Sequence, residues 1–206
     1  MAGSWGVGRA VGGCATMGRV TRIIAGAAGG RRIETPRGSG TRPTSDRVRE
    51  ALFAALDARG AVDGAVVVDL YAGSGALGLE AASRGAREVV LVDSAREAVA
   101  VARRNAAALG LDGVRVVQAP VLRWLAGQGV PRADLVLLDP PYALDEPGLA
   151  AVLRAVDQRC TAPGALVVVE RDARSPEPDW PARWRSETSR RYGDTVLWTA
   201  TASVPT

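Results

Sequence analysis

Short apolar runs alternate with longer amphipathic segments through the middle of the chain. The apolar runs predict buried strands, and they fall at residues 65–70, 88–93, 114–118, 134–139 and 165–170. The segments between them have a helical period and predict helices near residues 76–84, 95–109, 121–127 and 146–159. Strands that alternate with helices are typical of a parallel, doubly wound α/β sheet.

Hairpin patterns flank this alternating region on both sides. Residues 20–24 and 31–33 surround a Gly/Ala turn and predict a small N-terminal β-hairpin. Near the other end, residues 183–191 and 195–201 flank Gly193-Asp194, which predicts a C-terminal antiparallel hairpin. The expected fold is therefore a doubly wound α/β sheet with a C-terminal antiparallel hairpin and a small β-hairpin in front of it.

A helix is predicted between the N-terminal hairpin and the first long strand. Thr44 or Ser45 is the expected N-cap. Apolar residues at i, i+4 and i+8 form its buried stripe, and Gly60 ends it; the stripe consists of Val48, Leu52 and Leu56.

The 206 residues suit one domain with a small appendage. Residues 1–18 are rich in Gly, Ala and Ser without a period and are expected to be disordered. Residues 19–43 form the hairpin and a loop, and residues 44–206 form the main domain. Because no apolar run reaches ~18 residues, no membrane span is expected, and two distant cysteines fit a reduced cytoplasmic location.

The chain contains no histidine and no lysine, so all 26 basic residues are arginine. This composition excludes an imidazole base, a Ser–His nucleophile, a P-loop lysine and Schiff-base chemistry, and no metal site is expected. Residues 1–60 hold ten arginines and four acids, whereas the rest holds sixteen arginines and eighteen acids. A basic N-terminal segment favours a polyanionic partner, although an arginine-rich chain without such a partner explains the charge equally well.

A glycine-rich loop follows the first long strand. Gly73, Gly75 and Gly78 satisfy G-x-G-x-x-G between a strand and a helix, where backbone can approach a ligand closely. The second strand ends at Asp93, which is placed to accept both hydroxyls of a ribose. The candidate cofactor residues here are Asp69, Ala72, Gly73, Ser74, Gly75, Asp93 and Ser94.

Two cofactors fit this pattern, a nicotinamide dinucleotide and S-adenosylmethionine. Asp69 favours the second, because a carboxylate before the glycines repels a pyrophosphate but suits a cationic amino-acid moiety. The alternative is that Asp69 only holds the loop, as aspartate often does.

Asp139-Pro140-Pro141-Tyr142 closes the fourth predicted strand. The prolines stiffen the turn and leave carbonyls free to face a ligand, while Asp139 accepts hydrogen bonds and Tyr142 offers a flat face to a base. These residues are the candidate catalytic set, because together they suit a clamp for an exocyclic amine of a nucleobase. The alternative is an ordinary turn that ends a strand.

With these motifs in place, the chain resembles the RsmD family of 16S rRNA guanine-N2 methyltransferases. The resemblance runs through residues 20–145 and rests on four segments: residues 22–26 with Gly30-Arg31, residues 42–53, residues 69–84 and residues 139–142. It implies a Rossmann-like, seven-stranded methyltransferase fold with a small N-terminal β-hairpin, and S-adenosylmethionine as methyl donor. It also implies as acceptor a guanine of 16S rRNA in partly assembled small subunits, and a monomer is expected.

The chain departs from related enzymes after the third strand. They carry Asp or Asn there for the adenine amine, whereas this chain has Pro120. Gln118, Ala119, backbone groups or water are then the expected adenine contacts.

The N-terminal arginines are the candidate phosphate contacts. The set consists of Arg22, Arg31, Arg32, Arg42 and Arg47. About half of them can instead be surface charges or internal ion pairs. Because Arg47 and Arg49 lie two apart on a helix, at most one of them is expected to face the site. Three other readings stay open: adenine-N6 methylation of DNA or RNA, an NAD-dependent oxidoreductase and a non-catalytic rRNA-binding module.

Overall fold

The computed structural model describes residues 20–36 and 46–203. Its main sheet has seven strands in the order β5-β4-β3-β6-β7-β9-β8. The first five strands in this order are parallel to one another. β9 pairs antiparallel with β7, and β8 pairs antiparallel with β9. The strands are β3 (Val66–Leu70), β4 (Glu88–Asp93), β5 (Val114–Gln118), β6 (Ala133–Leu138), β7 (Thr161–Asp172), β8 (Trp184–Tyr192) and β9 (Thr195–Ala202). The predicted doubly wound sheet with a C-terminal hairpin is confirmed.

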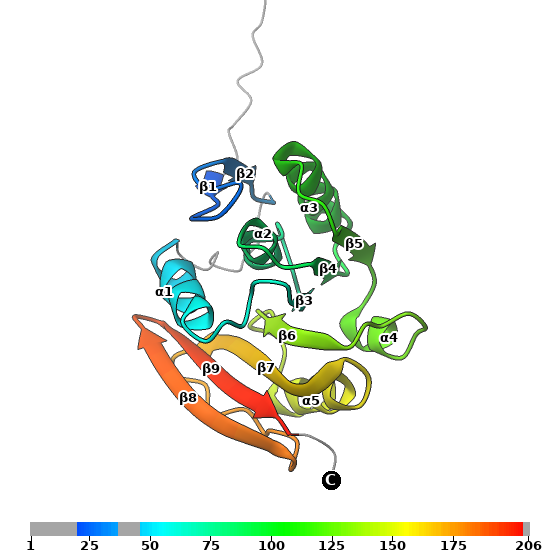
Figure 1. Ribbon diagram of the computed structural model, residues 1–206. Coiled ribbons are helices and arrows are strands. Elements are labelled where there is room, and N and C mark those ends of the chain that lie inside the picture. The colour runs from blue at the N-terminus through cyan, green and yellow to red at the C-terminus, as the bar shows by residue number, and fades with distance from the viewer. Residues whose placement is uncertain (1–19, 37–45, 204–206) are drawn as a thin grey trace, which may run out of the picture.

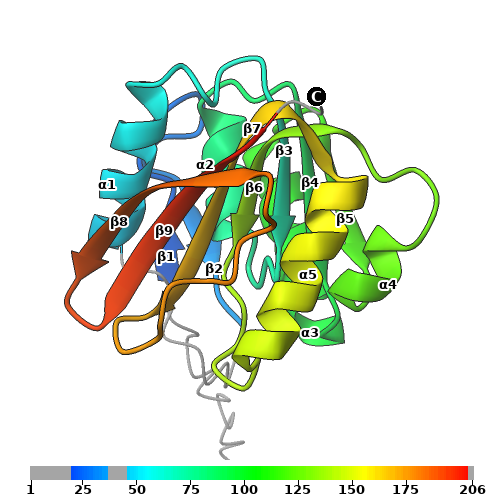
Figure 2. The same ribbon diagram turned by 90° about the horizontal axis from the view of Figure 1, so that it is seen from below.

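Helices cover both faces of the sheet (Figures 1 and 2). One face carries α1 (Asp46–Asp57), α2 (Ala76–Ser83) and α3 (Arg96–Leu109), and the other carries α4 (Val121–Leu125) and α5 (Glu146–Arg159). Neighbouring side chains of a strand point to opposite faces. In β3, Val67 therefore packs under α1–α3, while Val66 and Val68 pack under α4 and α5.

The N-terminal hairpin is short but belongs to the same core. Its strands β1 (Val20–Arg22) and β2 (Arg32–Glu34) have three residues each, so β1 ends before the predicted Ile24. Ile23 and Ile33 are buried in the cluster that also contains residues of α1 and α2. In the turn, a Cβ at Gly26 would lie 1.8 Å from the carbonyl oxygen of Ser83, so only glycine allows this approach.

A buried carboxylate joins the hairpin to α1 and α2. Glu80 has no exposed surface, and its Oε2 and Oε1 accept from the backbone N–H groups of Ile24 at 2.7 Å and Ala25 at 3.1 Å. Arg84 Nε donates to Glu80 Oε1 at 2.7 Å, and Arg49 Nε lies 3.8 Å from Glu80 Oε2. The position of the hairpin therefore depends on a paired charge inside the protein.

The remaining boundaries differ little from the predicted ones. β7 is longer than the apolar run at both ends, and α4 stops at Leu125. The predicted stripe on α1 is buried. The expected disorder of residues 1–18, the N-cap at Thr44 or Ser45, and Arg42 lie outside the described residues. Within the ranges that the structure covers, no helix has the length and apolar character needed to cross a membrane.

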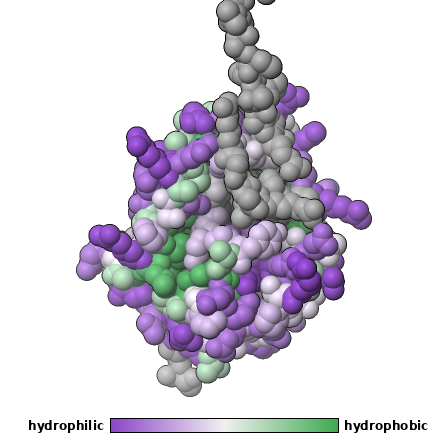
Figure 3. Space-filling view, turned by 180° about the vertical axis from the view of Figure 1, so that it is seen from behind, coloured by the Kyte–Doolittle hydropathy of each residue, from purple (hydrophilic) through white to green (hydrophobic). Residues whose placement is uncertain are grey.

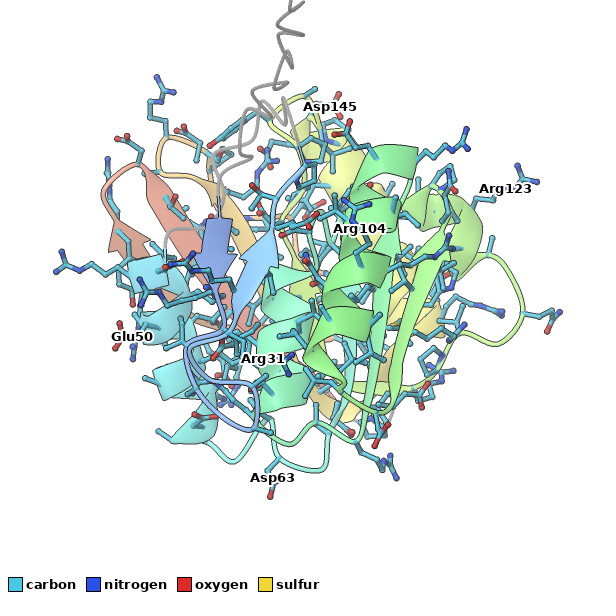
Figure 4. All side chains as sticks on the ribbon, turned by 90° about the horizontal axis from the view of Figure 1, so that it is seen from above. Arg31, Glu50, Asp63, Arg104, Arg123 and Asp145 are labelled. Atoms are coloured by element: carbon cyan, nitrogen blue, oxygen red, sulfur yellow. The ribbon has the colours of Figure 1, made fainter. Side chains whose placement is uncertain are left out.

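Replacing Glu80 by alanine should lower the free energy of unfolding by about 3 kcal/mol, because it leaves Arg49 and two backbone donors buried without the shared acceptor. Urea denaturation of the purified protein measures this loss. The control is Glu50→Ala on the exposed side of α1 (Figure 4), which should change stability by less than about 0.5 kcal/mol. Equal stability of the two variants would contradict the role given to Glu80.

Candidate functional site

Four carboxylates lie on neighbouring parallel strands toward one edge of the sheet. They are Asp69 of β3, Asp93 of β4, Asp139 directly after β6, and Glu170 of β7. Two positions before each acid, the side chain belongs to the core under α1, α2 and α3, namely Val67, Leu91, Leu137 and Val168. The strand period therefore directs all four acids to that face. Among the described residues, no group of His, Cys, Asp or Glu side chains could hold a metal ion.

The glycine loop between β3 and α2 has the close approaches that only glycine permits. Gly75 has a φ of 82°, and a Cβ at Gly78 would lie 2.2 Å from Leu91 Cδ2 of β4. Tyr71, just before the loop, also has a positive φ of 63°, which is uncommon for a residue with a side chain and is typical of functional sites. The backbone of the loop is thus held in a sharply turned conformation against β4.

Asp69 lies beneath this loop and is almost fully buried. Its Oδ2 accepts from the N–H of Gly78 at 2.8 Å, so it does hold the loop, as the simpler interpretation expected. Its Oδ1 is also buried but has no hydrogen-bond partner in the part of the chain that the structure describes. Burial, opposed by the Gly78 bond and helped by the charge of Asp93, raises its pKa to about 7. An unpaired buried oxygen of this kind suits a positively charged ligand group.

Asp93 faces the same loop from β4. Its Oδ2 accepts from the N–H of Gly73 at 2.9 Å, and its Oδ1 accepts from the N–H of Ala95 at 2.8 Å. A carboxylate offers about four acceptor positions, so these two bonds leave capacity for ribose hydroxyls. Ser94 next to it is exposed, whereas Ala72 and Ser74 are half-buried in the loop.

Gln118 and Ala119 lie beside Asp93, as the parallel register of β4 and β5 requires. Gln118 pairs with Asp93 in that register and is exposed. The N–H of Ala119 donates to the carbonyl of Asp93 at 2.9 Å, and Pro120 precedes α4 as its N-cap. The Ala119 amide is therefore already used, and the Gln118 side chain is the available polar group at this strand end.

A pocket of about 470 Å³ opens beside Asp139. Of the predicted set, Asp139, Pro140 and Tyr142 line it. Tyr142 as a residue is 60% exposed, which leaves its side chain accessible to a ligand. Pro141 is exposed as well, whereas Pro140 is buried. The other lining residues were not predicted from the sequence; they are Glu170, Arg171, Asp172, Arg174, Ser175 and Thr195. Glu170 shares with Asp93 a feature that is visible in the sequence: both are acids toward the carboxyl end of a predicted strand.

Arg171 supports the segment that follows Tyr142. Its Nη1 donates to the carbonyl of Leu144 at 3.1 Å, and its Nη2 pairs with Glu146 Oε1 at 2.5 Å. The side chain is 7% exposed, and its buried Nε has no partner among the described residues. Arg171 of β7 therefore holds the chain in place directly after the Asp139–Tyr142 turn.

Asn105 of α3 connects the hairpin to the glycine loop. Its Nδ2 donates to the carbonyls of Glu34 and Ser74, both at 2.9 Å, and its Oδ1 accepts from the N–H of Glu34 at 2.9 Å. A buried side chain thus links β2 directly to the predicted cofactor site.

The candidate phosphate contacts are not all in the same situation. Arg22, Arg31, Arg32 and Arg47 are exposed, whereas Arg49 is buried in the Glu80 network. Arg31 donates to the carbonyls of Leu109, at 2.7 Å, and Ala108 at the C-terminus of α3. Figure 4 shows Arg31 on the side of Asp63 and far from Asp145, which follows the Asp139–Tyr142 turn. The structure therefore does not bring Arg31 to the pocket.

Hydrophobic and hydrophilic side chains are segregated on the face of the molecule opposite the viewer of Figure 1. Figure 3 shows a hydrophobic area there with hydrophilic side chains around it. Such a surface suits a ligand that has an apolar body and polar groups at its rim.

A family model, curated relatives and solved structures are similar to this chain. The family model described as Conserved hypothetical protein 95 matches residues 21–201. Ribosomal RNA small subunit methyltransferase D of Escherichia coli (strain K12) is 39% identical over 166 residues, which are 79% of this chain and 80% of that protein. The solved structure of Escherichia coli yhhF has a TM-score of 0.79 and 32% identity, and covers 91% of this chain and 100% of that chain.

A more distant structure shows the same fold. The RNA methyltransferase of Salinibacter ruber in complex with S-adenosyl-L-homocysteine has a TM-score of 0.60 and 21% identity. The match covers 80% of this chain and 97% of that chain.

Asp69→Asn should remove a pH dependence of stability. Because the folded pKa of Asp69 lies near 7 and the unfolded value near 3.8, the folded state holds the proton more tightly, and stability falls as pH rises between these values. The asparagine variant keeps an acceptor for Gly78 and should gain up to about 4 kcal/mol over the wild type by pH 7. Urea unfolding from pH 4 to 8 measures the difference, and a constant difference would contradict the assignment.

Proposed function

Since the chain belongs to the RsmD family, whose model matches almost its whole length, we propose that it methylates the exocyclic N2 amine of one guanine in 16S rRNA. S-adenosylmethionine is the methyl donor. The substrate is the rRNA of a partly assembled small ribosomal subunit, and the protein acts as a monomer in the cytoplasm.

The observation that carries this proposal is the shared pocket of Asp139, Pro140 and Tyr142. It combines a carboxylate, a stiff turn and an exposed aromatic ring at one strand end. The pocket is large enough for a single base, and the ring of Tyr142 offers a stacking surface. A base in a folded RNA must leave its stack to enter such a pocket.

The residues of this chain position the acceptor amine. Guanine N2 is a poor nucleophile because its lone pair is conjugated with the ring. Asp139 and the carbonyl of Pro140 accept hydrogen bonds from its two N–H groups, which shifts the nitrogen toward tetrahedral geometry and directs its lone pair out of the ring plane. Tyr142 stacks on the base and holds it in place, a contact of about 1–3 kcal/mol. Most of the rate enhancement then comes from orientation.

The neighbouring carboxylates are placed to hold the cofactor. Asp69, with its unpaired buried oxygen, would face the positively charged amino-acid portion. Asp93 would accept from the ribose, and Gln118 from the adenine amine, in place of the usual Asp or Asn. When bound, S-adenosylmethionine supplies an electrophilic methyl group and a neutral leaving group, so this reaction needs no acid from the protein.

The basic N-terminal region serves as the RNA-binding part. Arg22, Arg32 and Arg47 are exposed and available for phosphate contacts, and Arg42 precedes α1 in the same region of the chain. Asn105 and the Glu80 network fix the hairpin to the glycine loop and to α1. RNA bound to the hairpin would therefore be held at a fixed position relative to the cofactor.

The experiment that tests the function is methyl transfer from labelled S-adenosylmethionine to small ribosomal subunits that lack this methylation. Nucleoside analysis should find the label in N2-methylguanosine at one position, with less incorporation into bare 16S rRNA. Label in N6-methyladenosine would overturn the proposed acceptor. An absence of label, with cofactor binding intact, would overturn methyl transfer to the small subunit.

Asp139→Ala should lower turnover by at least about 100-fold, because it removes the acceptor that orients the amine. Cofactor affinity, measured by calorimetry, should stay within about twofold of the wild type, since Asp69 and Asp93 remain. Asp63→Ala is the control, because Asp63 lies at the opposite end of the molecule from the pocket (Figure 4). Near-normal turnover of Asp139→Ala would show that the carboxylate has no role in the reaction.

Arg47→Ala and Arg31→Ala should differ in the salt dependence of RNA binding, which distinguishes an arginine that contacts phosphate from one that stabilises the fold. If Arg47 contacts a phosphate, its removal reduces the slope of log affinity against log salt by ~1. Arg31→Ala should leave that slope unchanged and lower stability by about 1 kcal/mol, because it removes a cation from the C-terminus of α3. Filter binding to small subunits at several salt concentrations measures the slopes, and equal slopes for Arg47→Ala and the wild type would contradict the contact.

A further inference from the structure

We propose that Glu170 reads the N1–H of the target guanine and thereby selects guanine over adenine. This inference rests on the proposed function and adds to it the residue that determines base specificity. It concerns the pocket already described, of which Glu170 is a lining residue.

The register of the sheet places Glu170 beside Asp139. Leu138 of β6 pairs with Val169 of β7 in parallel, and one further residue along both strands brings Asp139 next to Glu170. Adjacent strands lie about 4.8 Å apart. The residues two positions before them, Leu137 and Val168, belong to the core under α1–α3. Asp139 and Glu170 therefore point to that same face of the sheet.

Glu170 is held in a defined position. It is 8% exposed, although it lines the pocket. Its backbone pairs with Leu197 of β9, so it sits between two hydrogen-bonded strands, β6 and β9. A side chain that is held by a rigid backbone and largely shielded from water discriminates well between ligands. A mismatched polar group at such a position cannot form a compensating hydrogen bond with water.

The two carboxylates match the hydrogen-bond pattern of guanine. The Watson–Crick edge of guanine presents two adjacent donors, N1–H and N2–H₂. Ionised carboxylates only accept hydrogen bonds, so Asp139 accepts a hydrogen bond from an N2–H and Glu170 accepts one from N1–H. The side chain of Glu170 is longer by one methylene group, which lets it reach past the N2 amine that Asp139 holds.

The same arrangement rejects adenine. Adenine carries a lone pair at N1 in place of the proton, so a carboxylate at that position would face an acceptor and lose its hydrogen bond. The Asp-Pro-Pro-Tyr turn can bind the exocyclic amine of either base. Glu170 therefore supplies the discrimination that this turn lacks.

The test uses a base that keeps the methyl acceptor and changes N1. Small subunits are reconstituted from 16S rRNA that contains a synthetic fragment, with either guanine or 2-aminopurine at the methylated position. 2-Aminopurine retains the 2-amino group but has an unprotonated N1. The measured quantity is the ratio of the initial methylation rates of the two substrates, for the wild type and for Glu170→Gln.

The wild type should strongly prefer guanine, and Glu170→Gln should reduce that preference about 10- to 100-fold. The glutamine amide can donate to the unprotonated N1 of 2-aminopurine, which the carboxylate cannot do. Loss of O6 in 2-aminopurine affects both enzymes alike and cancels from the comparison. Asp172→Asn is the matched control, because Asp172 lines the same pocket from the same strand but pairs with Arg174, and it should leave the ratio unchanged.

The outcomes separate this inference from the proposed function. If the wild type methylates guanine N2 and Glu170→Gln keeps the wild-type ratio, Glu170 does not read N1, and the inference is overturned while the function stands. If the wild type methylates neither base in these subunits, the proposed function itself fails. Should Glu170→Gln fail to bind the cofactor, Glu170→Met gives a second variant. It should lower the guanine rate and leave the 2-aminopurine rate unchanged, and equal losses with both bases would overturn the inference.

Discussion

The parallel pairing of β4, β3, β6 and β7 is the constraint on which the site depends. Because parallel strands all end at the same edge, residues far apart in sequence become neighbours there, and the strand period decides which of them face one side. Asp69, Asp93, Asp139 and Glu170 satisfy both conditions. A slip of one residue in any strand would turn its acid toward the face covered by α4 and α5, so the hydrophobic pattern that fixes the register also fixes the site.

Carboxylates that lie close together at one edge of the sheet repel one another, and backbone N–H groups offset this repulsion to different extents. Asp93 accepts two backbone N–H groups, whereas Asp69 accepts one, leaves an oxygen unpaired and has its pKa raised to about 7. Of these two acids, Asp69 is therefore the one whose charge the hydrogen-bond donors of the protein satisfy less. A cationic ligand that approaches this oxygen gains more than it would from a carboxylate already fully paired. Under the proposed function, the buried carboxylate of Asp69 thus lowers stability at the position where the cofactor would bind.

Much of this arrangement could be predicted from the sequence, and the exceptions have physical reasons. The strands and helices followed from apolar runs and periods, and Asp69, Asp93 and Asp139 from their places at strand ends. Arg31 was predicted as an RNA contact because it is basic and near a hairpin, and its hydrogen bond to the C-terminus of a helix 78 residues away was not predicted. Such tertiary contacts leave no local pattern. Arg171 and Asn105 were missed for the same reason, since each acts through the backbone of a distant segment.

Because the chain has no lysine or histidine, these long-range contacts are all made by arginine side chains when they need a positive charge. Arg31, Arg84 and Arg171 each bind two acceptors at once, and their planar guanidinium groups suit such paired contacts better than an ammonium would. Each of them connects two segments that are distant in sequence: the hairpin turn to α3, α2 to α1, and β7 to the start of α5. Arginine therefore serves in this chain as a connector of the fold as well as a source of positive charge. The net charge of the N-terminal region consequently overstates the number of cations that are free to contact RNA. Arg49 is buried in an ion-pair network, and Arg31, although exposed, donates to backbone carbonyls of α3.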